Sequence, residues 1–176
     1  MTQPIPGRFI PAEFLTAHHY IFGQLKVTQS GLMGMMSDVT SSYLEMNEAS
    51  LALIHKPDEV VSYAPVLNVV RAQVIVVCLG KRDYLGLQGV VRSGFQRPQP
   101  YFVQATTASY DVRGTIERAG RLEFPALMSE GTNAFILVFD ARLTAPLFPA
   151  LNLQTPIMLL NRNYLESLAV LPRTEG

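Results

Sequence analysis

Three histidines and one cysteine are the side chains of this sequence best suited to metal binding or nucleophilic catalysis. His18 and His19 are neighbours, and neighbouring side chains on a strand point to opposite faces, so the pair cannot converge on one metal ion without a bulge. His55 lies far from them in the sequence. Cys78 lies inside the apolar run from Val74 to Leu79, where burial disfavours the reactive thiolate. We therefore expect a buried, structural Cys78 and no catalytic residue, metal site or cofactor.

Two arginine–tyrosine pairs are the best candidates for ligand contact. Arg82 and Tyr84 follow one apolar run, Arg162 and Tyr164 follow another, and both pairs have the pattern Arg-x-Tyr-Leu. An arginine can bind a phosphate or a carboxylate, and a tyrosine ring can stack on a base. In the alternative interpretation, which we prefer, the tyrosine closes the fold and the arginine covers its rim. Contact of these four residues with a ligand or a nucleic acid stays open.

Acidic residues next to small ones form a second set of candidates. Asp38 precedes Val-Thr-Ser-Ser, a context typical of a side chain that caps a turn. Glu48-Ala49 and Asp140-Ala141 can bind a cation, but a solvated strand end or turn is the more ordinary role. The sequence has no nucleophile elbow, phosphate-binding loop, dinucleotide fingerprint or His-Glu-x-x-His pattern. Nothing in these motifs indicates an enzyme.

Composition limits the partners and the compartment. Fourteen basic residues balance fourteen acidic ones, so no long-range field attracts nucleic acid or an anionic membrane. Hydrophobic residues make up 48% of the chain, enough for a core. A single cysteine excludes an intrachain disulfide, and no apolar stretch has the length of a signal peptide or a membrane span. These features predict a cytoplasmic protein without a membrane partner.

The elements that position these residues form an internal repeat of about ninety residues. The first half aligns with the second at three features in the same order: a Thr-Ala pair, a glycine within a strand and an acidic-Ala pair. A shorter shift aligns Arg82–Leu85 with Arg162–Leu165. The apolar runs that precede these two segments, Val74 to Leu79 and Pro156 to Leu160, are then predicted to be equivalent strands.

Each repeat is predicted to hold four or five strands and at most one short helix. Glycine within the first strand of each repeat indicates a bulge or a bend. The proline in Val60 to Arg71 indicates an edge strand or a bulge. The run Phe135 to Phe139, apolar throughout, indicates burial on both faces. The predicted elements are strands at Ala17–Val27, Ser42–His55, Val60–Arg71, Val74–Leu79, Ala108–Glu117 and Asn133–Thr144. Leu32–Val39 has helical spacing, and Leu122–Met128 allows a short helix only with Pro125 in its first turn, so the type of these two short elements stays open.

The fold class that follows is mainly β, with two tandem divergent repeats. Each repeat is a small barrel-like or half-open sheet unit of four or five strands. Glycine, proline and polar residues predict a linker at 89–100, which separates a first repeat at 1–88 from a second at 101–176. The exposed edges of such units favour packing of the two repeats on each other or on neighbouring chains.

This order of elements resembles bacterial small β-barrels of the Sm-like or SH3-like kind. The residues that carry the resemblance are Gly114 to Ile116, Phe135 to Ala141 and Asn161 to Leu165, with their counterparts in the first half. The resemblance implies a small barrel fold, oligomeric rings and RNA binding. The chain departs from it by lacking a recognisable signature for an RNA-binding loop.

The sequence therefore favours a non-enzymatic interaction or regulatory module that self-associates, as a homo-oligomer or with a protein partner. One alternative is an Sm-like barrel that binds single-stranded nucleic acid. The other is an enzyme or a small-ligand-binding protein with its site between the repeats, since domain interfaces are common pocket locations.

Overall fold

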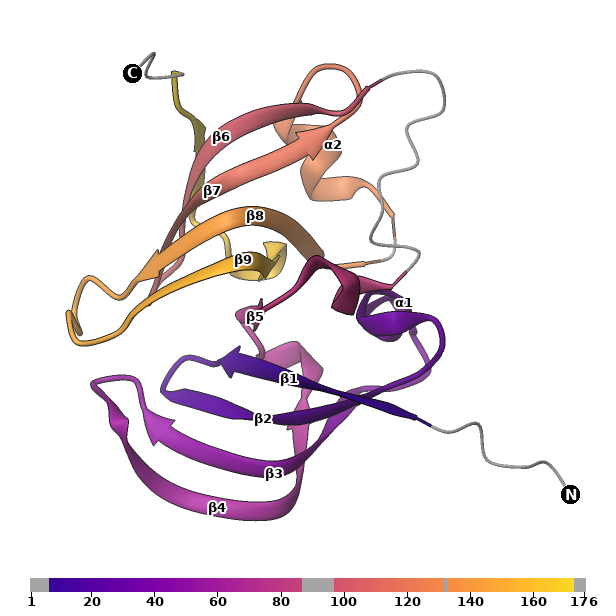
Figure 1. Ribbon diagram of the computed structural model, residues 1–176. Coiled ribbons are helices and arrows are strands. Elements are labelled where there is room, and N and C mark those ends of the chain that lie inside the picture. The colour runs from indigo at the N-terminus through magenta and orange to yellow at the C-terminus, as the bar shows by residue number, and fades with distance from the viewer. Residues whose placement is uncertain (1–6, 87–96, 132, 173–176) are drawn as a thin grey trace, which may run out of the picture.

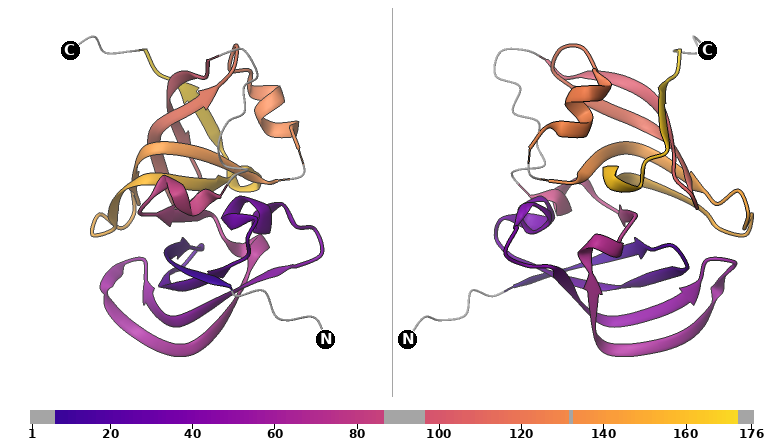
Figure 2. Two further views of the ribbon diagram at one scale, coloured as in Figure 1. Left: turned by 45° about the vertical axis from the view of Figure 1, so that its right-hand side comes forward. Right: turned by 180° about the vertical axis from the view of Figure 1, so that it is seen from behind.

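The computed structural model describes residues 7–86, 97–131 and 133–172 (Figures 1 and 2). The predicted linker at 89–100 lies mostly outside these residues. We call residues 7–86 the N-terminal half and residues 97–172 the C-terminal half. In the described part of the chain no helix has the length and apolar character needed to cross a membrane.

Ten strands of the described residues form one antiparallel sheet in the order β10-β6-β7-β8-β9-β5-β1-β2-β3-β4. The sheet does not close, and β4 and β10 are its two end strands. The prediction of a mainly β protein is confirmed. The N-terminal strands are β1 (Arg8–Leu15), β2 (His19–Val27), β3 (Tyr43–Leu53), β4 (Lys56–Val70) and β5 (Val76–Leu79). The C-terminal strands are β6 (Gln99–Thr106), β7 (Asp111–Arg118), β8 (Phe135–Thr144), β9 (Asn152–Asn161) and β10 (Ser167–Val170).

Two short α-helices connect strands within the described residues, at the two positions where the sequence allows them. The first, α1 (Gly31–Ser37), lies between β2 and β3, and the second, α2 (Phe124–Ser129), lies between β7 and β8. Pro125 occupies the first turn of α2, where its missing N–H breaks no helical hydrogen bond. Both helices lie along the same flank of the molecule (Figure 2).

Both halves contain one bulge at the predicted glycine position. Gly23 of β2 lies opposite two residues of β3, and Gly114 of β7 lies opposite two residues of β8. The extra residues, Glu48 and Asp140, have left-handed backbone angles, with φ of 50° and 48°. Thus the acidic residues form bulges in the middle of long strands, and the prediction of a strand end or a turn is wrong. The bulge bends the long strands, because two residues span the distance that one spans on the partner.

A Cβ atom at either bulge glycine would meet backbone atoms. At Gly23 it would lie 2.8 Å from the Asn47 carbonyl oxygen, and at Gly114 it would lie 2.8 Å from the Phe139 carbonyl oxygen. Both distances are shorter than a van der Waals contact. Close backbone approach is therefore the reason for glycine at these two positions.

The central strand β5 pairs with β9, and β5 and the segment 157–161 of β9 are buried on both faces. Figure 1 shows β1 to β4 below β6 to β9, with β5 between them. Successive residues of a strand point to opposite faces, so each central strand contributes to two apolar clusters. One cluster includes Val77, Leu79, Ile157 and Leu159, and the other includes Val76, Cys78, Met158 and Leu160.

The prediction that the apolar runs Val74 to Leu79 and Pro156 to Leu160 are equivalent strands is wrong. These runs form β5 and part of β9, which pair with each other. By position in the sheet, β9 follows β8 as β4 follows β3, and β10 lies beside β6 as β5 lies beside β1. Both runs are apolar because both strands are central, and burial alone produced the similarity. Three strands that the sequence reading did not assign are β1, β6 and β10. The last of these has only four residues and little burial.

Candidate interaction surfaces

Arg82 joins the two halves of the molecule. It lies in the 3₁₀ turn that follows β5, and its Nη1 donates a hydrogen bond to Glu117 Oε1 of β7 at 3.2 Å. Its guanidinium also lies 4.1 Å from the centre of the Phe139 ring, and its Nη2 lies 4.0 Å from Asp140 Oδ2. Tyr84, in the same turn, has Arg8 5.5 Å and Lys81 6.0 Å from its ring centre. Thus Arg82 contacts protein groups across the two halves.

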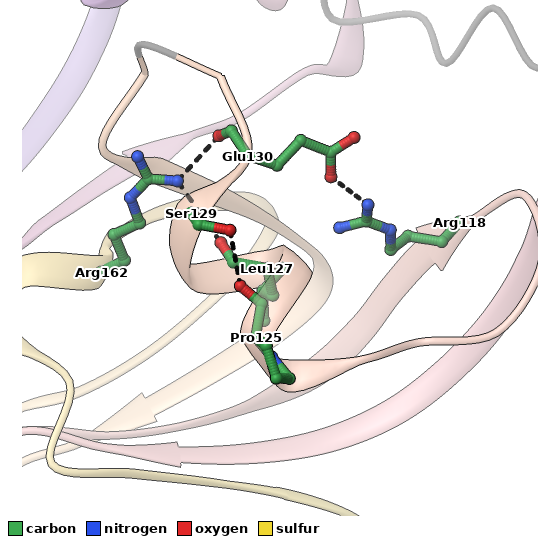
Figure 3. Close-up of polar contacts among 6 residues, drawn as sticks. All are labelled: Arg118, Pro125, Leu127, Ser129, Glu130 and Arg162. Carbon is green, nitrogen blue, oxygen red and sulfur yellow. Dashed lines mark hydrogen bonds and ion pairs between the residues drawn. The ribbon is translucent and has the colours of Figure 1, made fainter.

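Arg162 binds the C-terminal end of helix α2 (Figure 3). Its Nη1 donates to the carbonyl oxygens of Leu127 and Glu130, at 3.4 and 2.8 Å, and its Nη2 donates to that of Gly131 at 3.3 Å. These oxygens end a helix or follow it, where carbonyls have no helical partner and a cation is favourable. The Arg118–Glu130 ion pair flanks the same helix end (Figure 3).

Tyr164 also makes a contact between the halves. It follows Arg162 in a 3₁₀ turn between β9 and β10, and its hydroxyl donates to the Ala72 carbonyl oxygen at 2.6 Å. Among the four predicted contact residues, Arg82 and Tyr164 thus cross between halves, while Arg162 holds a helix end. Contact of these residues with a ligand or nucleic acid stays a prediction.

Arg71 makes structural contacts that the sequence did not predict. Its Nη1 donates to the carbonyl oxygens of Met35 and Met36, at 3.1 and 3.4 Å, and to that of Asp38. Arg71 therefore holds the end of α1 as Arg162 holds the end of α2. Both arginines directly follow a proline-containing strand, β4 or β9. This shared sequence context could have paired Arg71 with Arg162. The Arg-x-Tyr-Leu pattern instead aligned Arg162 with Arg82.

Asp38 caps a turn, as predicted. Its Oδ1 accepts hydrogen bonds from the backbone N–H of Thr40 at 2.8 Å and from the Thr40 hydroxyl at 2.6 Å. These hydrogen bonds lower the pKa of the Asp38 carboxyl, because they stabilise its charged form.

Cys78 is 1% exposed, which confirms its predicted burial. Burial raises the pKa of its thiol far above the ordinary range, and the negative charge of Glu13 raises it further. The His55 ring lies 5.9 Å from the Phe148 ring. Within residues 7–86, 97–131 and 133–172, no three His, Cys, Asp or Glu side chains are grouped to hold a metal ion.

A surface hollow of about 520 Å³ lies over β1, β2 and β3, and Cys78 of β5 and Thr155 of β9 also line it. Its lining includes Glu13, Gln24, Glu48 and Ser50. Glu13 already accepts a hydrogen bond from Tyr20, and Glu48 accepts one from Tyr63. The hollow therefore offers two carboxylates that are engaged by tyrosines, beside the Cys78 thiol.

The free edge of β4 is the largest unpartnered feature of the sheet. This strand has fifteen residues and pairs with β3 on one side only. Unpaired N–H and C=O groups of an edge strand are a template for pairing with another strand. Five of its large apolar side chains are more than half exposed: Val60, Val61, Tyr63, Val66 and Val70. We call this strand side the β4 edge.

The opposite end of the sheet is the free side of β10, which we call the β10 edge. This strand pairs only with β6 and presents Ser167, Ala169 and Val170 as exposed residues. Figure 1 places β4 at the bottom of the molecule and the yellow C-terminal strand near the top. The two edges therefore lie at opposite ends and do not meet within one molecule.

The fold and these surfaces define a mainly β protein with an open sheet and two free edges. Comparisons with protein-family models, with curated proteins and with solved structures find no match.

Proposed function

We propose that this protein is a non-enzymatic interaction module, built from two related β units, that self-associates through its sheet edges. The observation that carries the proposal is the β4 edge, a long strand with an unpaired side and exposed valines. Natural edge strands usually carry charges, prolines or bulges that prevent pairing. In β4 the charges and prolines are confined to residues 56–65, and Val66 to Val70 carry no charge and no proline.

Four matching features support two related units. Thr16 and Thr107 each accept a hydrogen bond from a backbone N–H three residues later, at the turn into β2 or β7. Gly23 and Gly114 face bulges with left-handed residues. Arg71 and Arg162 hold the ends of α1 and α2. The strand order β5-β1-β2-β3-β4 in one half parallels β10-β6-β7-β8-β9 in the other.

The experiment is sedimentation velocity over about a hundredfold range of protein concentration. We expect the mean mass to rise with concentration. Val66→Lys, which places a charge on the β4 edge, raises the dissociation constant by at least about tenfold, or about 1.4 kcal/mol. A wild-type protein that stays monomeric throughout contradicts the proposal.

The matched control is Leu147→Lys. Leu147 is 77% exposed and lies in the connection between β8 and β9, on neither free edge. This substitution makes the same change from an apolar residue to lysine, so it leaves the association unchanged. An equal effect of both variants would point to net charge and not to the β4 edge as the cause.

The cytoplasm stays the expected compartment, as the single cysteine indicates.

A protein partner with an exposed strand of its own would use the same edges by strand addition.

A further inference from the structure

We propose that self-association is head-to-tail: β10 of one copy pairs antiparallel with β4 of the next, in the register that β5 adopts on β9 within the chain. This inference rests on the proposed function and specifies the partner of each edge. The template is the junction at the centre of the sheet, where the fifth strand of the N-terminal half pairs with the fourth strand of the C-terminal half.

The central junction has a defined register. Residues Val76 to Leu79 of β5 pair with residues Leu160 to Ile157 of β9, antiparallel. Pro156 directly precedes the paired segment of β9, and Arg162 follows the strand. A proline lacks the N–H that a ladder requires, so it favours pairing that begins after it.

The β4 strand has the same arrangement. Pro65 directly precedes Val66, and Arg71 follows the strand. Pairing with the preceding strand gives the same correspondence. Val70 lies opposite Tyr43, the first residue of β3, as Asn161 lies opposite Phe135, the first residue of β8. The segment Val66–Val69 thus occupies on β4 the position that Ile157–Leu160 occupies on β9.

The β10 strand occupies the position of β5. Val76 lies opposite Leu15 and Ser167 lies opposite Thr106, and each of these partners directly precedes a turn threonine, Thr16 or Thr107. Transfer of the central register gives four pairs between copies. They are Ser167 with Val69, Leu168 with Asn68, Ala169 with Leu67 and Val170 with Val66.

The side chains suit this contact. Val66 is 53% exposed and Val170 is 52% exposed, and the contact would bring these two valines together. Neither four-residue segment contains a charged residue. Burial of apolar area and new backbone hydrogen bonds then both favour the pair.

The contact is heterologous, so every added copy leaves one β4 edge and one β10 edge free. Such contacts give a closed ring or an open filament, depending on the rotation between copies. A symmetric pairing of two β4 edges is the competing arrangement. It has no counterpart in the structure, and it leaves the β10 edge without a partner.

The test is disulfide cross-linking of cysteine variants under mild oxidation. Directly opposite residues of an antiparallel pair have Cα atoms about 4.5–5.5 Å apart, within the range of a disulfide. Val66→Cys and Val170→Cys, prepared separately and mixed, are expected to form a cross-linked heterodimer. The double variant V66C/V170C is expected to form a ladder of higher species. Cys78 is buried and stays reduced in all samples.

The matched control is V60C/V170C. Val60 is 54% exposed, on the same strand, but lies outside the proposed register. Its cross-linking is expected to be at least about tenfold slower. Equal rates for the two double variants would overturn the register.

The other outcomes separate this inference from the proposed function. If Val66→Cys cross-links with itself in preference to Val170→Cys, the pairing is symmetric, and self-association stands while the head-to-tail inference fails. If sedimentation shows association but the mixture gives no cross-link, the head-to-tail inference again fails. If the protein stays monomeric, both proposals fail.

Hydrogen exchange of the unmodified protein gives a second test that needs no variant. In the associated state, the amides of residues 66–70 and 167–170 are both expected to exchange more slowly than in the dilute monomer. Slowing in residues 66–70 alone contradicts the head-to-tail arrangement.

Discussion

Glu48 and Asp140 show how single residues shape this sheet. Each adopts a left-handed backbone conformation inside a long strand, which for residues other than glycine is uncommon and costs about 1 kcal/mol. The facing glycine leaves space for the bulge that this conformation creates. The acidic residue and the glycine therefore act as one unit on two strands.

Gly23→Ala is expected to lower the free energy of unfolding by about 1–3 kcal/mol. The new Cβ would lie 2.8 Å from the Asn47 carbonyl oxygen and 3.0 Å from the Ala49 Cα, both backbone atoms that cannot rotate away. The measurement is urea denaturation followed by circular dichroism. The matched control is Gly80→Ala, whose Cβ would meet nothing within 4 Å. Equal effects of the two substitutions would show that the change in the chain entropy of the unfolded state, and not a steric clash at Gly23, sets the stability difference.

Three side chains, the buried Cys78 and Tyr110 and the half-buried Tyr20, are expected to make stability fall at high pH. Burial raises the pKa of Cys78, Tyr20 and Tyr110, so the folded state keeps their protons. Below about pH 8 both states are protonated and no stability is lost; above it, the unfolded chain releases protons that the folded chain retains. Unfolding free energies measured from pH 7 to 11 are expected to decrease from about pH 8 upward, first through Cys78 and above about pH 9 also through the tyrosines.

Cys78→Ala tests this explanation. The variant lacks the thiol, so its stability is expected to decline less steeply between about pH 8 and 10, where a free thiol titrates in the unfolded chain. Identical pH profiles for the variant and the wild type would exclude a contribution of Cys78.

At the scale of elements, the short helices depend on arginines from distant strand ends. Both α1 and α2 have fewer than eight residues, too few to be stable alone in water. Arg71 and Arg162 satisfy carbonyl oxygens at their C-terminal ends. Helix α1, between β2 and β3, is thereby fixed to the end of β4. Helix α2, between β7 and β8, is fixed to the end of β9 in the same way.

Arg162→Ala is expected to lower the unfolding free energy by about 1–3 kcal/mol, because hydrogen bonds from a charged donor are lost at a helix end. Arg71→Ala is expected to have a similar effect on α1. Thermal unfolding gives the comparison, with the exposed Arg113→Ala as the control, expected to change stability by less than about 0.5 kcal/mol. A full effect of Arg113→Ala would make loss of positive charge the explanation.

At the scale of the whole molecule, the two halves are coupled through β5 and β9. These strands pair with each other and supply side chains to both apolar clusters. Arg82 and Tyr164 add polar contacts between the halves. A break at the centre would therefore expose apolar surface on both sides.

Leu159→Ala and Leu160→Ala are neighbouring substitutions in β9 that affect different clusters. Each is expected to destabilise the protein by about 2–5 kcal/mol. We expect each to shift one single unfolding transition, seen alike by circular dichroism and by tyrosine fluorescence. Two separate transitions, only one of which moves in each variant, would show that the halves unfold independently.

Much of the fold could be predicted from local patterns. Three kinds of local signal were informative: the apolar run Phe135 to Phe139, the prolines Pro65 and Pro125, and the glycines Gly23 and Gly114. Each of them restricts the backbone or the burial of the strand or helix that contains it. Strands with weak apolar character, such as β10, left no comparable signal, since their neighbours in the sheet place them.

The sequence by itself determined a mainly β protein and a buried Cys78, and it located two short segments between strands and a proline-marked strand without deciding whether they form helices and an edge. Only the tertiary structure decided that β5 pairs with β9, that Arg71 matches Arg162, and that β4 and β10 end the sheet. The reason is that an apolar strand reads the same in the sequence whichever strand lies beside it. Pairing depends on the positions of residues far apart in the chain.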